Sequence, residues 1–377
     1  MGKNLPLVEA ISILVGTIIG AGILGIPYVV AQAGFLTGMV VLVVLSVAVI
    51  LINLLLGEIV LSTQGNHQLT GYAEKYFGKI GKYLMFGSVV FGFYGALLAY
   101  IIGEGEALAA LAGGSPLLYS LIFFAFASLL VYIGLVIIKR FEFFMTLAIM
   151  TIVIIITFWG ASAINLDHLR EFSLLKLFVP YGVIFFAIGG MSAIPQLRLA
   201  LKGQEQKVKQ AIIIGSVIPF VVYFIFTLLV VGVTGLKTTA IATIGLGQTI
   251  GEAMIIFGNL FAVFTMGTSF LTLGLALRDT YKYDLKISHF WAWSLACLVP
   301  LVVFLFGLHD FVGVIGTVGA VGGGLEGLLV LAIYLKLRSL KQRERLPEYQ
   351  LSLPMPLVAL LTLIFIGGMI FTFFNLS

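Results

Sequence analysis

"GTIIGAGILGIPY", residues 16–28, lies inside an apolar run, 6–33, that is long enough to cross a lipid bilayer. The stretch nevertheless carries four glycines and a proline. Glycine costs roughly 1 kcal/mol relative to alanine in a helix interior, and proline costs about 3 kcal/mol. Because unsatisfied backbone groups are costly in hydrocarbon, non-helical backbone persists there only when it is buried in protein or lines a watery cavity. The stretch therefore predicts a membrane helix that breaks at a site.

The whole chain has the composition of a membrane protein. It has 377 residues, of which 61% are hydrophobic and 10% are charged. Soluble domains carry about 25% charged residues. Apolar runs near the membrane-spanning length recur from end to end, so we predict an all-α polytopic membrane protein with one transmembrane domain over 1–377. The eleven predicted transmembrane helices are 6–33, 35–62, 83–112, 117–138, 141–163, 177–201, 208–235, 248–278, 289–306, 311–337 and 354–374.

The basic residues are distributed unevenly between the loops. If the N-terminus is placed inside, all of the 21 Lys and Arg residues fall on the inner side except Arg170, Lys176 and Lys237. This asymmetry is the positive-inside signal. It predicts a protein of the plasma (cytoplasmic) membrane with a cytoplasmic N-terminus and an external C-terminus. It also accounts for the net charge of +5 without a nucleic-acid partner.

A weak internal repeat links the first helix to the sixth. "GILGIP" at 22–27 and "GMSAIP" at 190–195 share the spacing from a glycine to an Ile-Pro pair. The sixth helix lies five crossings after the first, so the two helices have opposite orientations. Interrupted helices at corresponding places in two inverted halves indicate a transport site near the membrane midplane. The alternative, in which the glycines only permit close helix packing, stays open.

A broken helix pair offers two kinds of backbone group to a ligand. The half-helix N-termini expected around 20–22 and 187–190 expose N–H groups, which suit a carboxylate. The half-helix C-termini expose carbonyls, which suit a cation or an ammonium group. The pair therefore predicts a receptor for a zwitterion.

Three motifs resemble a known family. "GTIIGAGILGIPYVVAQAG" (16–34) resembles the first helix of the amino acid/auxin permease group of the amino acid-polyamine-organocation superfamily, which includes hydroxy and aromatic amino acid permeases and neutral amino acid transporters. "LLAYIIGEGEAL" (97–108) and "TSFLTLGLALRD" (268–279) resemble the third and eighth helices of the aromatic permeases. Membership implies the LeuT-type fold. In that fold, inverted five-helix repeats of about 6–163 and 177–337, with broken helices 1 and 6, precede an eleventh helix at about 354–374.

The resemblance also implies substrate contacts at both breaks. A first-helix segment would receive the substrate carboxylate, and a sixth-helix segment would bind the amino group and enclose the side chain, with an aromatic wall from the third helix. These residues are Gly20, Ala21 and Gly22, then Phe186, Ala187, Ile188 and Gly189, and finally Tyr100. No Lys or Arg lies deep in a predicted span, which argues against an acidic substrate side chain. We therefore expect import of a neutral L-amino acid, with an aromatic or large aliphatic side chain permitted.

The resemblance also implies a site for a coupling ion. In sodium-coupled relatives, first-helix carbonyls and two eighth-helix hydroxyls hold one Na+; here these match Gly16 and Ile19 with Thr268 and Ser269. The alternative is that both hydroxyls bond back to their own helix. Some proton-coupled relatives place a fifth-helix lysine at this position. Since 141–163 contains no lysine, the sequence favours Na+ over H+.

Proton coupling remains the open alternative, because the aromatic permeases are commonly proton-coupled. Glu104 and Glu326 are the carboxylates predicted to lie deepest in the spans. An ionisable group inside the membrane is expensive and by default a functional candidate. Both residues are therefore candidates for a proton relay, against the alternative of a structural hydrogen bond to a neighbouring helix.

Other classes of protein fit the sequence less well. A membrane enzyme would need converging catalytic groups, but the four histidines lie in loops or at predicted helix ends. A channel would also use glycine-rich breaks, and it would conduct without saturating. We predict a secondary active transporter with no cofactor besides the coupling ion. Its partners would be the amino acid and the bilayer, and a monomer would suffice.

Overall fold

The computed structural model describes residues 5–134, 151–339 and 343–375, and within these ranges every regular element is helical. Eight helices there are long and apolar enough to cross a membrane, or nine if the bent pair α1 (Leu5–Ile18) and α2 (Gly22–Ala33) forms one span. Two shorter apolar helices, Thr151–Ala163 and α12 (His289–Leu305), accompany them. The architecture is that of a polytopic membrane protein.

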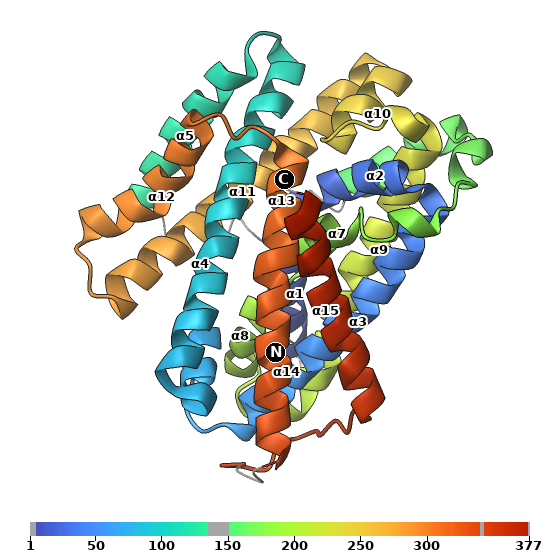
Figure 1. The fold of residues 1–377 in the computed structure, drawn as a ribbon. Coiled ribbons are helices and arrows are strands. Elements are labelled where there is room, and N and C mark those ends of the chain that lie inside the picture. Colours follow the sequence, from blue (N-terminus) through green and yellow to red (C-terminus); the bar gives the residue numbers. More distant parts are fainter. Residues whose placement is uncertain (1–4, 135–150, 340–342, 376–377) are drawn as a thin grey trace.

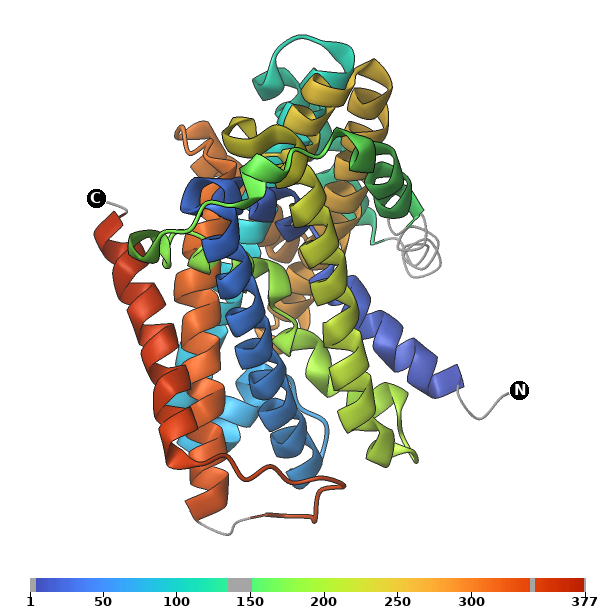
Figure 2. The same cartoon turned by 90° about the vertical axis from the view of Figure 1, so that its right-hand side faces the viewer.

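The helices pack into one bundle (Figure 1). In this view α4, α14 and α15 run side by side, and Figure 2 shows α15 at the outer edge against α14. The remaining helices are α3 (Phe35–Ser62), α4 (Leu69–Ala112), α5 (Pro116–Ile133), α7 (Tyr181–Ile188), α8 (Ile194–Ala200), α9 (Val208–Thr234), α10 (Ala242–Ile250), α11 (Glu252–Asp279), α13 (Phe311–Thr317), α14 (Gly324–Ser339) and α15 (Met355–Asn375).

Several predicted boundaries differ from the observed ones because glycines take left-handed conformations. In the region of the helix predicted at 117–138, α5 ends at Ile133, where Gly134 has φ 72°, and residues 135–138 lie outside the described residues. The helix predicted at 248–278 is preceded by α10, from which Gly251, with φ 129°, separates it. The helix predicted at 83–112 begins earlier, at Leu69, and its first part is set off by a kink at Gly78, with φ 64°. The first part of the predicted helix 141–163, residues 141–150, lies outside the described residues.

Both predicted breaks are present. The first occupies 19–21, so that Gly22 already begins α2, and the axes on its two sides differ by 53°. The second is narrower than predicted. It is confined to Gly189 and Gly190, because Ala187 and Ile188 still belong to α7, and a 3-10 turn, η4 (Met191–Ala193), leads into α8. "GILGIP" and "GMSAIP" therefore each begin at a break.

The two broken helices cross antiparallel at their breaks. α1 packs against α8, and α2 packs against α7. A Cβ added at Gly22 would lie 2.5 Å from the Cα of Ala187, a distance that no real side chain tolerates. Glycine at this position therefore lets the start of α2 meet the end of α7.

The helix predicted at 311–337 is also interrupted. Between α13 and α14 the chain forms a π-helical segment, η8 (Val318–Gly323). Its glycines make room for α7, since a Cβ at Gly319 would lie 2.5 Å from the backbone nitrogen of Phe186. Such π-segments occur frequently at functional sites.

Candidate functional site: a cavity between the two breaks

A cavity of about 570 Å³ lies where the two broken helices cross. Its walls come from both breaks, from α4 and α11, and from η8 with the first turn of α14. Most of the residues predicted from the sequence line it. These are Gly16, Ile19, Gly20, Ala21, Gly22, Tyr100, Phe186, Ala187, Gly189, Thr268, Ser269 and Glu326. Two predicted residues, Ile188 and Glu104, are not among the lining residues.

The cavity extends toward one end of the bundle. Its lining continues to Gln68 and Thr70, near the start of α4, and to Asp279 and Thr280 at the end of α11. These segments belong to loops that the charge distribution predicts to be cytoplasmic. α1 leans away from the bundle toward this end (Figure 2).

The first break presents backbone to the cavity. A Cβ at Gly20 would lie 3.4 Å from the Ser269 Oγ and 3.7 Å from the Tyr100 hydroxyl, so Gly20 faces these two side chains across a narrow gap. Within the described chain no side chain caps the first turn of α2. In the described chain the N–H groups of Ile23 and Leu24 donate to the carbonyls of Gly20 and Ala21 at 3.3 Å and 3.0 Å. The N–H groups of the break and of Gly22 therefore remain to meet an anionic ligand group.

Tyr223 on α9 is a site residue that the sequence reasoning missed. Its side chain is fully buried, and its hydroxyl lies 2.6 Å from the carbonyl oxygen of Ile18 and 3.2 Å from that of Ala187. These two carbonyls come from the ends of α1 and α7, one beside each break. A tyrosine in the middle of an apolar span was the available signal, because a buried phenol usually finds an acceptor.

The four predicted ion ligands lie on different walls of the same cavity. Gly16 and Ile19 belong to α1 and the first break, and α1 packs mainly on α8 and α9. On α11, Thr268 donates its hydroxyl proton to Phe264 O at 2.8 Å, as the alternative interpretation expects. This bond uses the proton and leaves oxygen lone pairs that can still coordinate a cation. The Ser269 Oγ and the Tyr100 hydroxyl both lie next to the position of Gly20.

The two candidate glutamates, Glu104 and Glu326, lie in different environments. Glu326 lines the cavity from the first turn of α14. Glu104 is fully buried, and neither of its carboxyl oxygens has a hydrogen-bond partner among the described residues. It packs against α11, since a Cβ at Gly267 would lie 3.1 Å from its Oε1. Of the two candidate glutamates, only Glu326 lines the cavity.

The charged residues that line the cavity are all acidic in the described chain. Asp279 and Glu326 are acidic, and no Lys or Arg occurs among the described residues that line it. A substrate with a second carboxylate would therefore meet no basic partner. Aromatic side chains, Phe93, Tyr100, Phe185 and Phe186, supply apolar surface.

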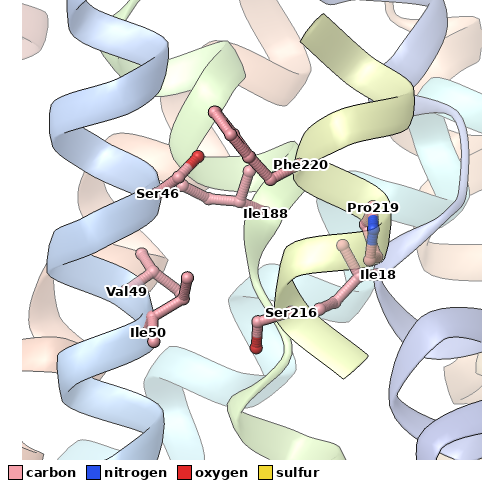
Figure 3. Close-up of a pocket in the computed structure, with 8 residues that line it drawn as sticks. All are labelled: Ile18, Ser46, Val49, Ile50, Ile188, Ser216, Pro219 and Phe220. Carbon is pink, nitrogen blue, oxygen red and sulfur yellow. The ribbon is translucent and has the colours of Figure 1, made fainter. Parts of the chain in front are cut away.

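A second, much smaller cavity of about 10 Å³ lies behind the breaks (Figure 3). Ile18 and Ile188 line it at the two half-helix ends, between Ser46 on α3 and Ser216 on α9. Both serine hydroxyls are buried without a partner in the described part of the chain. The volume is about what one water molecule requires.

Fold and cavity together define an integral membrane protein with a central site built on two crossed, broken helices. The sequence matches the tryptophan/tyrosine permease family over residues 3–374, and the chain belongs to this family. The resemblance to amino acid permeases is thus confirmed. The chain is a transporter rather than an enzyme.

Two relatives are similar to the chain over most of their length. A protein of Aliivibrio fischeri named glutamine transporter 2 is 26% identical over 355 residues, which cover 90% of this chain and 92% of the relative. A protein of Haemophilus influenzae named tyrosine-specific transport system 1 is 28% identical over 337 residues, covering 81% of this chain and 82% of the relative. Both names describe amino acid transport.

Proposed function

We propose that this protein is a secondary active transporter that imports neutral L-amino acids, with aromatic or large aliphatic side chains accepted, by alternating access. A cation gradient drives the import, with Na+ favoured over H+. The observation that carries the proposal is the crossing of the two breaks, where Gly22 meets Ala187 beside a cavity of about 570 Å³. This geometry supports a receptor for the amino and carboxyl groups that all amino acids share.

Each break receives one end of the zwitterion in this proposal. Gly20, Ala21 and Gly22 hold the carboxylate at the uncapped start of α2. The carbonyls at the end of α7 accept the ammonium group, with Phe186, Ala187 and Gly189 lining the side-chain space. Ile188 contributes only its backbone, because its side chain lines the small cavity. Tyr100 forms the opposite wall.

We further propose the LeuT-type arrangement of two inverted five-helix repeats and an eleventh helix, with a cytoplasmic N-terminus and an external C-terminus. The antiparallel crossing of α1–α2 with α7–α8 supports the inversion. With this orientation the cavity opens to the cytoplasm. The conformation is therefore the one that releases substrate.

Sodium would bind between Gly16 and Ile19 on one wall and Thr268 and Ser269 on the other, through carbonyl and hydroxyl oxygens. All four residues line the cavity, and such oxygens suit a hard cation. The second candidate is an H+-coupled permease. It is favoured by Glu326, which lines the cavity, with Glu104 as the buried alternative.

The substrate class rests on the cavity lining and on the names of the relatives. The absence of basic lining in the described chain disfavours acidic amino acids. Glutamine and tyrosine, the amino acids in the relatives' names, are both neutral. Neutral side chains of different size are therefore the first to test.

Uptake by the purified protein in proteoliposomes tests the proposal. Labelled tyrosine and glutamine are presented with an inward Na+ gradient, with a pH gradient, or with neither, while unlabelled amino acids compete. Saturable uptake that requires the Na+ gradient is expected. Equal uptake with and without Na+ would overturn sodium coupling, flux without saturation would indicate a channel, and no uptake of any amino acid would overturn the transport assignment.

A further inference from the structure

One face of α11 lines the cavity from the proposed ion ligands to the open end. Thr268, Thr272, Ala276 and Asp279 follow one another at intervals of three or four positions and share this face, and Thr280 follows directly after the helix. Ser269, Leu273 and Leu277 line the cavity beside them. Hydroxyl side chains thus recur between the proposed ion site and the carboxylate of Asp279.

The threonine hydroxyls on this face are oriented so that their oxygen atoms can act as acceptors toward the cavity. Thr268 donates its proton to Phe264 O, and Thr280 donates its proton to Ala276 O at 2.9 Å. With the protons directed to their own helix, the oxygen lone pairs remain available to the cavity. Thr272, half-buried between them, adds a hydroxyl to the same wall.

Asp279 is held in a fixed orientation at the open end. Its Oδ1 accepts hydrogen bonds from the Nε of Arg278 at 3.0 Å and from Nη2 at 2.7 Å. Arg278 is itself buried, and its Nη1 donates to the carbonyls of Val131 and Tyr132 at the end of α5. The Asp279 side chain remains 42% exposed.

This arrangement favours a cation over an anion at the open end. Arg278 does not line the cavity, whereas Asp279 does. A cleft lined by one sign of charge concentrates ions of the opposite sign. Because Arg278 neutralises part of the carboxylate charge from behind, we expect a weak binding position rather than a tight one, as release requires.

We propose that this face of α11 is the path by which the coupling cation leaves the site, with Thr272 as an intermediate ligand and Asp279 as the last binding position. The inference rests on the proposed cation coupling. It adds Thr272 and Asp279 to that mechanism, and it gives Asp279 a role beyond its contact with Arg278.

The test measures how the cation concentration on the open side of the protein affects substrate flux. Proteoliposomes carrying the protein in inside-out orientation expose the open end to the medium, where Na+, or H+ if the pH gradient drives uptake, is titrated against substrate flux. Asp279→Asn keeps an oxygen for Arg278, and Thr272→Val keeps the shape of the side chain. Glu74→Gln is the matched control. Its carboxylate is as exposed as that of Asp279 and pairs with Lys82, but it does not line the cavity.

We expect Asp279→Asn and Thr272→Val to raise the half-maximal cation concentration on the open side at least about threefold, since each removes an oxygen ligand from the path. Half-saturation by substrate should not change, and Glu74→Gln should match the parent. Parental values in both variants would overturn the release path. If the parent protein shows no cation dependence at all, the proposed coupling fails instead.

Loss of the Asp279 contact could also disturb Arg278 and the end of α5. Thermal unfolding of Asp279→Asn therefore accompanies the flux measurement. Thr272→Val touches none of the Arg278 contacts, so it keeps the inference falsifiable if Asp279→Asn does not fold. A parental cation response of a folded Thr272→Val would then overturn the path.

Discussion

The phenol of Tyr223 donates a hydrogen bond of 2.6 Å to the carbonyl of Ile18, the last residue of α1. The same oxygen lies 3.2 Å from the carbonyl of Ala187 on α7. One hydroxyl proton thus serves two acceptors, one beside each break. Through Tyr223, α9 thereby holds the ends of α1 and α7 together. Any movement of α1 relative to α7 must change this contact.

Replacing Tyr223 by Phe should impair transport more than folding. The ring keeps its packing, but two buried carbonyls lose their donor, which costs about 1–3 kcal/mol for an unsatisfied group. We expect a fall of about tenfold in maximal uptake, the equivalent of 1.4 kcal/mol, in a protein that still purifies as a folded monodisperse species.

Tyr334→Phe is the matched control, because the buried phenol of Tyr334 also donates to a carbonyl, that of Leu351, at 2.7 Å but away from the breaks. Equal uptake rates for the two variants would show that Tyr223 has no special place in the site.

Gly22 should tolerate no side chain. A Cβ there would meet Ala187, so Gly22→Ala is expected to separate the two breaks and abolish uptake. Gly87→Ala provides the comparison, since a Cβ at Gly87 meets nothing within 4 Å. Uptake of labelled amino acid by both variants checks this. Parental activity in Gly22→Ala would mean that the close crossing is not required.

The broken helices could be predicted because their cause is local. Four glycines and a proline within thirteen residues cannot form a stable membrane helix without compensation, whatever surrounds them. The second break was placed too early, at Ala187, because the residues alone do not show how far α7 continues. Its glycines nevertheless indicated the correct place in the fold.

The remaining site residues depend on tertiary contacts. The sequence shows that Tyr223 lies in an apolar span, but its two acceptors become neighbours only when α1 and α7 cross. Glu104 and Glu326 look alike in sequence. Only the rotation of their helices, α4 and α14, buries Glu104 among packed side chains and places Glu326 in the wall of the cavity. The π-segment η8 has no comparable sequence signal apart from its glycines.

Thr268→Val and Ser269→Ala should weaken cation activation selectively. Each removes one hydroxyl oxygen from the proposed Na+ site while nearly preserving volume. We expect the half-maximal external Na+ concentration to rise about tenfold, which corresponds to roughly 1.4 kcal/mol for one lost ligand. Thr249→Val is the control, because Thr249 on α10 bonds back to Gly245 O at 2.9 Å in the same way but does not line the cavity. An unchanged Na+ response in both site variants would contradict the assignment.

The two glutamates should differ in how they affect uptake driven by protons. If Na+ is the driving ion, Glu326→Gln and Glu104→Gln both keep Na+-dependent uptake. If H+ drives transport, Glu326→Gln should abolish accumulation under a pH gradient while leaving substrate exchange intact, because Glu326 alone of the pair lines the cavity. Measuring accumulation and exchange side by side separates the two cases. Loss of accumulation in Glu104→Gln alone would identify the buried residue instead.

The loop between α14 and α15 should make stability depend on pH. Glu344 accepts a hydrogen bond of 2.5 Å from Lys75 and one of 2.7 Å from the backbone of Gln64, and these contacts hold the pKa of its carboxyl below the usual value of 4.5. A carboxyl whose pKa is lowered by folding stabilises the fold fully above its unfolded pKa, and this contribution is lost as the pH falls through the folded pKa.

Glu344→Gln should therefore lower the thermal unfolding midpoint slightly at pH 7, and the difference from the parent should shrink as the pH falls below 4.5. The effect is small because the pair is exposed and screened by salt. Unfolding in detergent at several pH values and at two salt concentrations checks it, with Glu74→Gln as a second exposed pair for comparison. A difference that persists at low pH would show that the loop is held by its backbone contacts to Ser62, from Glu344 and Arg345, and not by the carboxylate.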